Sequence, residues 1–206
     1  GPAVTSTLQG ILGAAASADS ATLRSEDVVR ASSGDTRSLS IFYAGFGLVL
    51  AGFLFGLISY QMTPRLQLRF RLLSLGAFSL LSGTGVALIA GTPGFGALPG
   101  NVATIAAVTV LLAMAVGSAT LLLMRVGGPV GTLLASLVLL ILGNATGGGT
   151  LPPDFLPGWL RPLSDILPAG LGLRALQGES YFDGDGYVSG ILLLGAWVAI
   201  SLGIVY

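Results

Sequence analysis

The chain has 206 residues, of which 53% are hydrophobic and 9% are charged, and its mean hydropathy is +0.88. Soluble globular domains carry roughly a quarter of their residues as charged side chains, so this composition excludes an ordinary soluble domain and predicts a membrane protein. Nine Arg balance nine acidic residues, which leaves no basic excess for a nucleic-acid backbone, and nucleic-acid binding is excluded.

The residue types that are missing limit the chemistry of the protein. The sequence contains no Lys, His or Cys, which removes the commonest transition-metal ligands and the thiolate, imidazole and Schiff-base nucleophiles. No pair of carboxylates is placed for acid–base catalysis. We therefore expect no catalytic residues, no metal and no cofactor, and a protein that is not an enzyme.

Residues 1–38 contain apolar side chains scattered among Ser, Thr, Ala, Asp and Arg, with no stretch long enough to cross a membrane. Short helices are expected to begin at Ala14 to Ala21 and at the Ser25-Glu26-Asp27 cluster. We interpret this segment as the end of an extracytoplasmic region that leads into a transmembrane domain formed by residues 39–206.

Five apolar stretches approach the length of about 20 residues that a spanning helix needs. The fourth is short, and it either begins nearer Gly127 or continues as unwound backbone into Asn144. Gly52 and Gly56 form a small-residue pair that favours packing within the chain over a dedicated dimer contact. The expected fold is an all-α integral membrane bundle, with spans at about 39–60, 72–90, 102–124, 128–144 and 188–206.

The arginines predict the orientation. Arg65, Arg69 and Arg71 follow the first span, Arg125 follows the third, and no acid accompanies them. The other five Arg and all nine acids fall in the remaining segments. By the positive-inside rule the chain has its N-terminus outside and its C-terminus inside a bacterial cytoplasmic membrane.

An outward N-terminal segment needs a means of crossing the membrane. Residues 1–38 contain neither a signal sequence nor a span, so we expect a membrane helix upstream of this chain. The alternative is that the short tail crosses unaided.

The loop from Asn144 to Tyr187 is the least generic part of the sequence. It opens with a Gly-rich break and continues through a Pro-rich apolar segment, which fits neither a straight span nor a soluble loop. We expect a pair of short helices at about 151–177 that lies at, or dips into, the outer interface. Its candidate gate or interfacial residues are Gly147, Gly148, Gly149, Pro153, Phe155, Pro157, Trp159 and Pro168.

The order of these features resembles a known family. The Gly-rich break, the Pro-Gly-Trp-Leu group at 157–160, Ile166-Leu167-Pro168 and Tyr181-Phe182-Asp183-Gly184 are similar to the region before the last span in ABC-2 type transporter permeases, and most closely to the YhgE/Pip group. The resemblance implies six spans, of which this chain holds the second to sixth, preceded by a large extracytoplasmic domain.

The resemblance also implies partners. ABC-2 permeases move lipids, polysaccharides or drugs with an ATPase, and the chain has no GxxxxGK[ST] motif, so ATP hydrolysis would need a separate subunit. The ATPase contact would fall at the loop with Arg65, Arg69 and Arg71. Residues 64–71 alternate Arg with apolar residues in a strand-like period, unlike the expected coupling helix, so anchoring by anionic membrane lipids is the alternative.

Two functions remain open. One is a permease that exports a lipidic or amphipathic substrate, with residues 151–176 as its outer gate. The other is a non-transporting scaffold or accessory subunit of a secretion or cell-envelope complex, since the YhgE/Pip group is linked to type VII secretion and phage adsorption. A homodimer is compatible with both.

One acidic motif resembles a metal site only superficially. The run Asp183-Gly184-Asp185-Gly186 lacks the further ligands and the closing Glu of a calcium loop, so a tight turn is the favoured interpretation.

Overall fold

The fold is all helical over the part of the chain that can be described. The computed structural model describes residues 2–18, 22, 29, 31–35, 37–62, 67–149 and 152–205. Within these residues, 5 helices are long and apolar enough to cross a membrane. The expected all-α membrane bundle of five spans is thereby confirmed.

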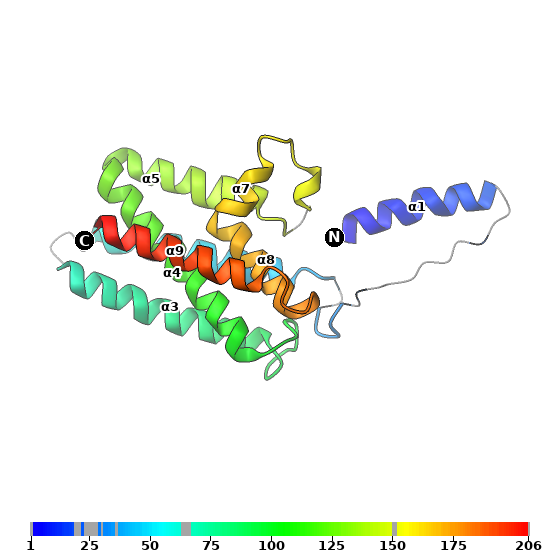
Figure 1. Ribbon diagram of the computed structural model, residues 1–206, viewed down its shortest axis with the longest axis horizontal. Helices are drawn as coiled ribbons and strands as arrows, with labels where there is room; N and C mark the ends of the chain where they lie inside the picture. Colours follow the sequence, from blue (N-terminus) through cyan, green and yellow to red (C-terminus); the bar gives the residue numbers. More distant parts are fainter. Residues whose placement is uncertain are drawn as a thin grey trace.

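The spans follow one another up and down through the bundle (Figure 1). They are α2 (Ser40–Met62), α3 (Leu68–Ala90), α4 (Val102–Gly127), the continuous segment Pro129–Thr146 and α9 (Tyr187–Val205). The Pro129–Thr146 span consists of α5 (Pro129–Ala135), the π-helical η1 (Ser136–Leu142) and α6 (Gly143–Thr146). The shorter elements are α1 (Pro2–Ala18), η2 (Pro153–Phe155), α7 (Arg161–Ile166) and α8 (Pro168–Tyr181).

Two sequence-based boundaries need correction. The helix α3 begins at Leu68 rather than at residue 72, so Arg69 and Arg71 lie in its first turn and not in an extended loop. Their alternation with apolar residues suggested a strand, but helical hydrogen bonding decides backbone conformation beside a membrane span. The fourth span covers Pro129–Thr146, so it begins close to Gly127, which was one of the two expected alternatives. The other alternative, unwound backbone into Asn144, is wrong because Asn144 lies in α6.

The N-terminal segment also differs in detail from the prediction. The helix α1 covers Pro2–Ala18, so it starts well before Ala14, and it stands away from the bundle in Figure 1. The Ser25-Glu26-Asp27 cluster lies outside the described residues.

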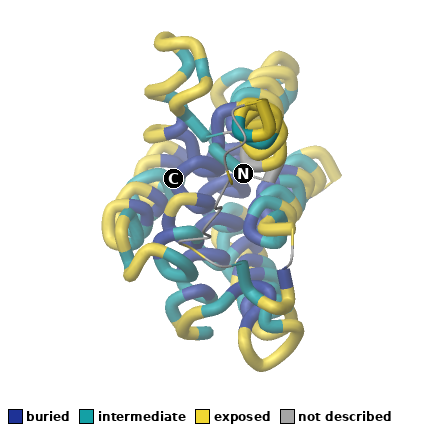
Figure 2. The backbone as a smooth tube through the Cα atoms, turned by 90° about the vertical axis from the view of Figure 1, so that its right-hand side faces the viewer, coloured by how far each residue is buried: buried dark blue, intermediate teal, exposed yellow. Residues whose placement is uncertain are grey.

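Helix α4 is the centre of the bundle. It packs against α2, α3, α5, α8 and α9, and Leu112, Ala113 and Ala115 have no exposed surface. Figure 2 shows the buried residues gathered in the middle of the bundle and the exposed ones around its rim. The large apolar side chains on that rim, such as Leu81 and Leu133, are suited to contact with lipid.

Small residues let the other spans approach α4 closely. A Cβ atom at Gly52 would lie 2.7 Å from the carbonyl oxygen of Ala113, and one at Gly56 would lie 2.7 Å from the Cβ of Thr120. The pair therefore packs within the chain, as the sequence favoured. The Thr109 hydroxyl adds an interhelical hydrogen bond of 2.9 Å to the carbonyl of Gly83 on α3.

The up-and-down order gives the bundle two different ends. We call the "hairpin end" the one formed by residues 31–35, 37–39, 91–101, 147–149, 152–160 and 179–187. The opposite "arginine end" holds the start of α3 and the turn from α4 to α5, with Arg69, Arg71 and Arg125. The described acidic residues lie at the hairpin end except for Asp165 in α7, and none lies among the described residues of the arginine end.

The contact between α2 and α4 can be tested by overpacking. We expect Gly56→Leu to lower the free energy of unfolding by about 1–3 kcal/mol, because the new side chain meets Thr120 and the backbone of Gly117. The measurement is an SDS titration in mixed micelles, monitored by circular dichroism. Gly47→Leu is the matched control, since a Cβ at Gly47 meets nothing within 4 Å. Equal stability of the two variants would contradict this packing.

Candidate functional site

The candidate site is the helical hairpin formed by α7 and α8. The helix α7 ends at Ile166, Leu167 adopts an extended conformation (φ −75°, ψ 142°), and Pro168 starts α8. Proline at the first helical position needs no hydrogen-bond acceptor, and its fixed φ favours the new helix. The chain therefore turns sharply at Leu167, which we call the "tip" of the hairpin.

The hairpin enters the bundle instead of lying across its end. Near its open end, the Glu179 carboxylate of α8 accepts a hydrogen bond of 3.0 Å from the amide of Asn101, just before α4. Deeper in, a Cβ at Gly190 of α9 would lie 2.7 Å from the Cβ of Ala175. At the tip, the indole N–H of Trp197 donates a hydrogen bond of 2.7 Å to the carbonyl of Ile166.

These contacts give the depth of the tip. Trp197 follows Tyr187, the first residue of α9, by ten residues, which is about 15 Å along a helix axis. A hydrocarbon core is about 30 Å thick, so the backbone of Trp197 lies about halfway along a span of that length, and its ring reaches the tip from there. The hairpin therefore runs alongside α9 for part of its length, as a re-entrant or interfacial helix pair before the last span would.

Helix α8 is buried to a degree that the sequence did not indicate. Its residues from Pro168 to Leu173 are all buried, and the helix packs against α2, α4, α6 and α9. Helix α8 therefore lies among the spans rather than on the outside of the bundle. Three glycines and two alanines in Pro168–Tyr181 let the helix fit between its neighbours, where larger side chains would collide with Leu112 or Ser164.

The Gly-rich bend at 147–149 packs against this hairpin and against α2. A Cβ at Gly147 would lie 2.9 Å from the carbonyl oxygen of Gly143 and 3.0 Å from a methyl carbon of Leu173 on α8. Gly148 has a φ of +76°, a conformation that favours glycine, and lies beside Pro153. Gly149 is in close contact with the ring of Phe42 on α2. The bend thus joins the end of the fourth span to two other elements.

The remaining predicted gate residues form an exposed loop at the hairpin end. Phe155, Pro157 and Trp159 are exposed and lie apart from the buried Pro168. A 2.6 Å ion pair between Arg161 and Asp154 closes the loop on itself. The structure therefore divides the eight predicted residues into a packed bend, a buried tip residue and an exposed apolar loop.

The predicted arginine contacts lie at the opposite end. Arg69 donates a hydrogen bond of 2.8 Å to the side chain of Gln67, and its guanidinium lies 4.8 Å from the ring centre of Phe70. The guanidinium of Arg71 lies 5.6 Å from the ring centre of Tyr60. Arg125 is exposed in the last turn of α4, and Arg65 lies outside the described residues. Residues 63–67 connect the end of α2 to the start of α3.

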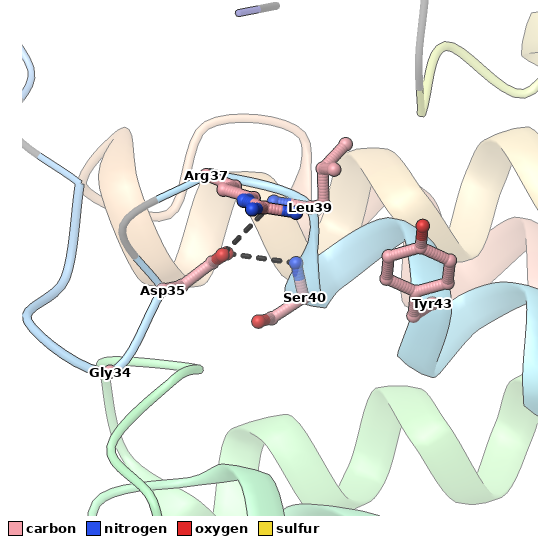
Figure 3. Close-up of a pocket in the computed structure, with 6 residues that line it drawn as sticks. All are labelled: Gly34, Asp35, Arg37, Leu39, Ser40 and Tyr43. Atoms are coloured by element: carbon pink, nitrogen blue, oxygen red, sulfur yellow. Dashed lines mark hydrogen bonds between the residues drawn. The ribbon is translucent and has the colours of Figure 1, made fainter.

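The segment before α2 makes polar contacts at the hairpin end that the sequence pattern did not predict. Asp35 is buried, and its carboxylate accepts hydrogen bonds from the amides of Leu39 (3.0 Å) and Ser40 (2.8 Å) at the start of α2 (Figure 3). The hydroxyl of Ser32 donates to the carbonyl of Gly96, in the loop between α3 and α4. Asp35 also lines a shallow pocket with Gly34, Arg37, Leu39, Ser40 and Tyr43.

The acidic run before α9 forms a turn. Asp183, Gly184 and Gly186 all have positive φ, at 49°, 85° and 77°, and the amide of Gly184 donates a 2.9 Å hydrogen bond to the carbonyl of Gly178. The favoured interpretation as a tight turn is confirmed. Among the residues described, no cluster of three or more acidic side chains is arranged to hold a metal ion.

Comparison of the chain with protein-family models, with curated proteins and with solved structures gives no match. The candidate site therefore rests on the geometry of the hairpin, the bend and the two ends of the bundle.

The role of Asp35 can be separated from that of an exposed carboxylate. We expect Asp35→Ala to lower the free energy of unfolding by about 1–2 kcal/mol, because two amides at a helix start lose a charged acceptor. Asp154→Ala is the control, since its ion pair with Arg161 is exposed and contributes at most about 1 kcal/mol. The measurement is the same SDS titration. A larger loss in the Asp154 variant would contradict the assignment.

Proposed function

We propose that this chain is the transmembrane part of a permease that moves a lipidic or amphipathic substrate across a bacterial cytoplasmic membrane. The α7–α8 hairpin is its outer gate, and the hairpin end faces the outside. The observation that carries this proposal is the depth of the tip, held halfway along α9 by Trp197.

A broken helix within a membrane bundle is a costly feature. Backbone groups that leave a helix in apolar surroundings need other partners, so membrane proteins keep such breaks mainly where protein or a water-filled path surrounds them. In transporters, discontinuous helices of this kind lie beside substrate sites near the midplane. The hairpin has this form, and the bend at 147–149 and Pro168 are natural points for its movement.

The sequence resemblance to ABC-2 permeases of the YhgE/Pip group supports the same function. The order of four spans, a short helical pair and a last span agrees with what that resemblance implies for spans two to six. In this proposal a separate subunit hydrolyses ATP and meets the arginine end, where Arg69, Arg71 and Arg125 lie.

A second function is favoured by one specific observation. The described arginines of the arginine end lie in the terminal turns of spans, Arg69 and Arg71 in α3 and Arg125 in α4. This placement suits contact with lipid headgroups, and a scaffold or accessory subunit of a secretion or cell-envelope complex needs no further contact at this end. In that case the arginines contact anionic lipid headgroups, and a second copy of the chain or another subunit packs beside the spans.

Transport can be measured on the protein purified from its native membrane with whatever subunits accompany it. The preparation is reconstituted with ATP in vesicles that carry a fluorescent short-chain phospholipid, and headgroup movement is followed by chemical quenching from outside. We expect movement above that of protein-free vesicles. Gly147→Val should reduce the rate at least about tenfold, because the side chain forces the bend away from Leu173 and Gly143.

Two controls separate transport from assembly. Gly158→Val adds the same side chain where a Cβ meets nothing within 4 Å, so it should transport normally. Trp159→Ala, in the exposed loop, should slow transport and leave the subunit composition unchanged. A parent protein without movement, together with loss of partner subunits in the Gly147 variant, would reject the permease and favour the scaffold.

A further inference from the structure

The break at the hairpin tip creates a backbone problem in the middle of the membrane. Leu167 leaves the helical conformation, and Pro168 has no N–H group, so the helical hydrogen-bond ladder is interrupted at this point. The carbonyl of Ile166 ends α7 beside this interruption. An acceptor at this depth has no bulk water to bond, and it needs a donor from the protein.

Trp197 supplies that donor from a different span. Its indole nitrogen lies 2.7 Å from the Ile166 carbonyl oxygen, although the two residues are separated by 31 positions in sequence. The ring packs against the core of the bundle, and Leu167, next to the bonded carbonyl, is only 4% exposed. The hydrogen bond therefore joins the moving part of the proposed gate to the fixed helix α9.

One polar contact of the hairpin joins its two helices to each other, and the others join the hairpin to the rest of the bundle. The ion pair between Arg174 and Asp165 joins α8 to α7, so it keeps the hairpin together as one body and travels with it. Glu179 binds the open end of the hairpin to the amide of Asn101 and the hydroxyl of Thr104. The Trp197 bond holds the opposite end, at the tip. Packing of residues 168–173 also holds α8, so loss of the Trp197 bond weakens the hold on the tip while the open end stays attached.

We propose that Trp197 is a latch that holds the hairpin tip at mid-membrane depth, through the hydrogen bond from its indole N–H to the carbonyl of Ile166. When the bond opens, the tip moves toward the hairpin end, where water can satisfy the carbonyl. This inference rests on the proposed function, in which the hairpin is the outer gate. The gate is closed when the Trp197 bond is formed. The effect of the latch on the position of the tip does not depend on transport.

The chain is well suited to a test, because it has no Cys and only two Trp residues. A single Cys replaces the half-exposed Ile166, and its reaction with a membrane-impermeant maleimide is timed in vesicles. With Trp197 present, labelling is slow. Trp197→Phe keeps an aromatic ring and removes the donor, so the labelling rate should rise by roughly twofold to tenfold, the range that corresponds to one net hydrogen bond.

Two further variants keep the test decisive. Leu192→Phe changes an exposed side chain of the same helix, α9, and should leave the labelling rate unchanged. Replacement of Trp197 by 3-benzothienylalanine preserves the bicyclic shape and exchanges the N–H for sulfur, so it separates the lost donor from lost packing if the Phe variant folds poorly. An unchanged labelling rate with 3-benzothienylalanine overturns the latch.

The position of Trp197 is checked independently in the Trp159→Phe chain, which leaves it as the only fluorophore of its kind. Phospholipids brominated deep in the acyl chain should quench its emission more than those brominated near the headgroup. Stronger quenching by the shallow label overturns the mid-membrane position. If labelling is faster without the Trp197 donor but the protein moves no lipid, the latch is retained and the permease is rejected. If the protein moves lipid but labelling is unchanged, the permease is retained and the latch is rejected.

Discussion

The structure depends on the close packing of four spans and α8 around α4. Lipid chains are as apolar as the side chains of the bundle, so burial from water does not hold membrane helices together, and packing and interhelical hydrogen bonds must. The backbone of α4 is approached closely by α2 at Gly52 and Gly56, and by α3 at Gly83. The hydroxyl of Thr109 on α4 donates a hydrogen bond to the carbonyl of Gly83 on α3. Most other hydroxyl groups in the spans serve their own helices: Ser82, Ser118 and Thr120 donate to carbonyls one turn earlier.

The hairpin follows from the same constraint. Because α4 fills the centre, α8 can enter only where small residues face it, and Gly172 beside Leu112 and Ala175 beside Gly190 provide that space. Backbone N–H and C=O groups in apolar surroundings need hydrogen-bond partners, so each group that leaves the helix at the Leu167 break needs another partner. Trp197 meets this need for Ile166. The depth of the hairpin is thus a result of packing along its length and of one hydrogen bond at its tip.

Charge is organised by the ends of the bundle. The arginine end presents Arg69, Arg71 and Arg125, while the described acids lie at the hairpin end except for Asp165, which pairs with Arg174 within the hairpin. Asp35 caps the start of α2 from a few residues upstream, and Glu179 of α8 binds a separate segment at the start of α4. The favourable field of a helix start contributes to both. Between the two ends the described residues of the spans are apolar or small and polar, and the Asp165–Arg174 ion pair of the hairpin is the exception.

Hydropathy, length and proline act locally, so the spans, their order and the break at Ile166-Leu167-Pro168 follow from the sequence. The sequence also predicts that the connections after the first and third spans carry arginines without acids. Only the packed arrangement of the helices places Arg69 and Arg71 in α3, buries α8, joins Trp197 to the hairpin tip and joins Glu179 to the start of α4. Glu179 bonds to Asn101 across 78 positions and Trp197 to Ile166 across 31. Such pairs have no local pattern, since they arise only when the packing around α4 brings distant helices together.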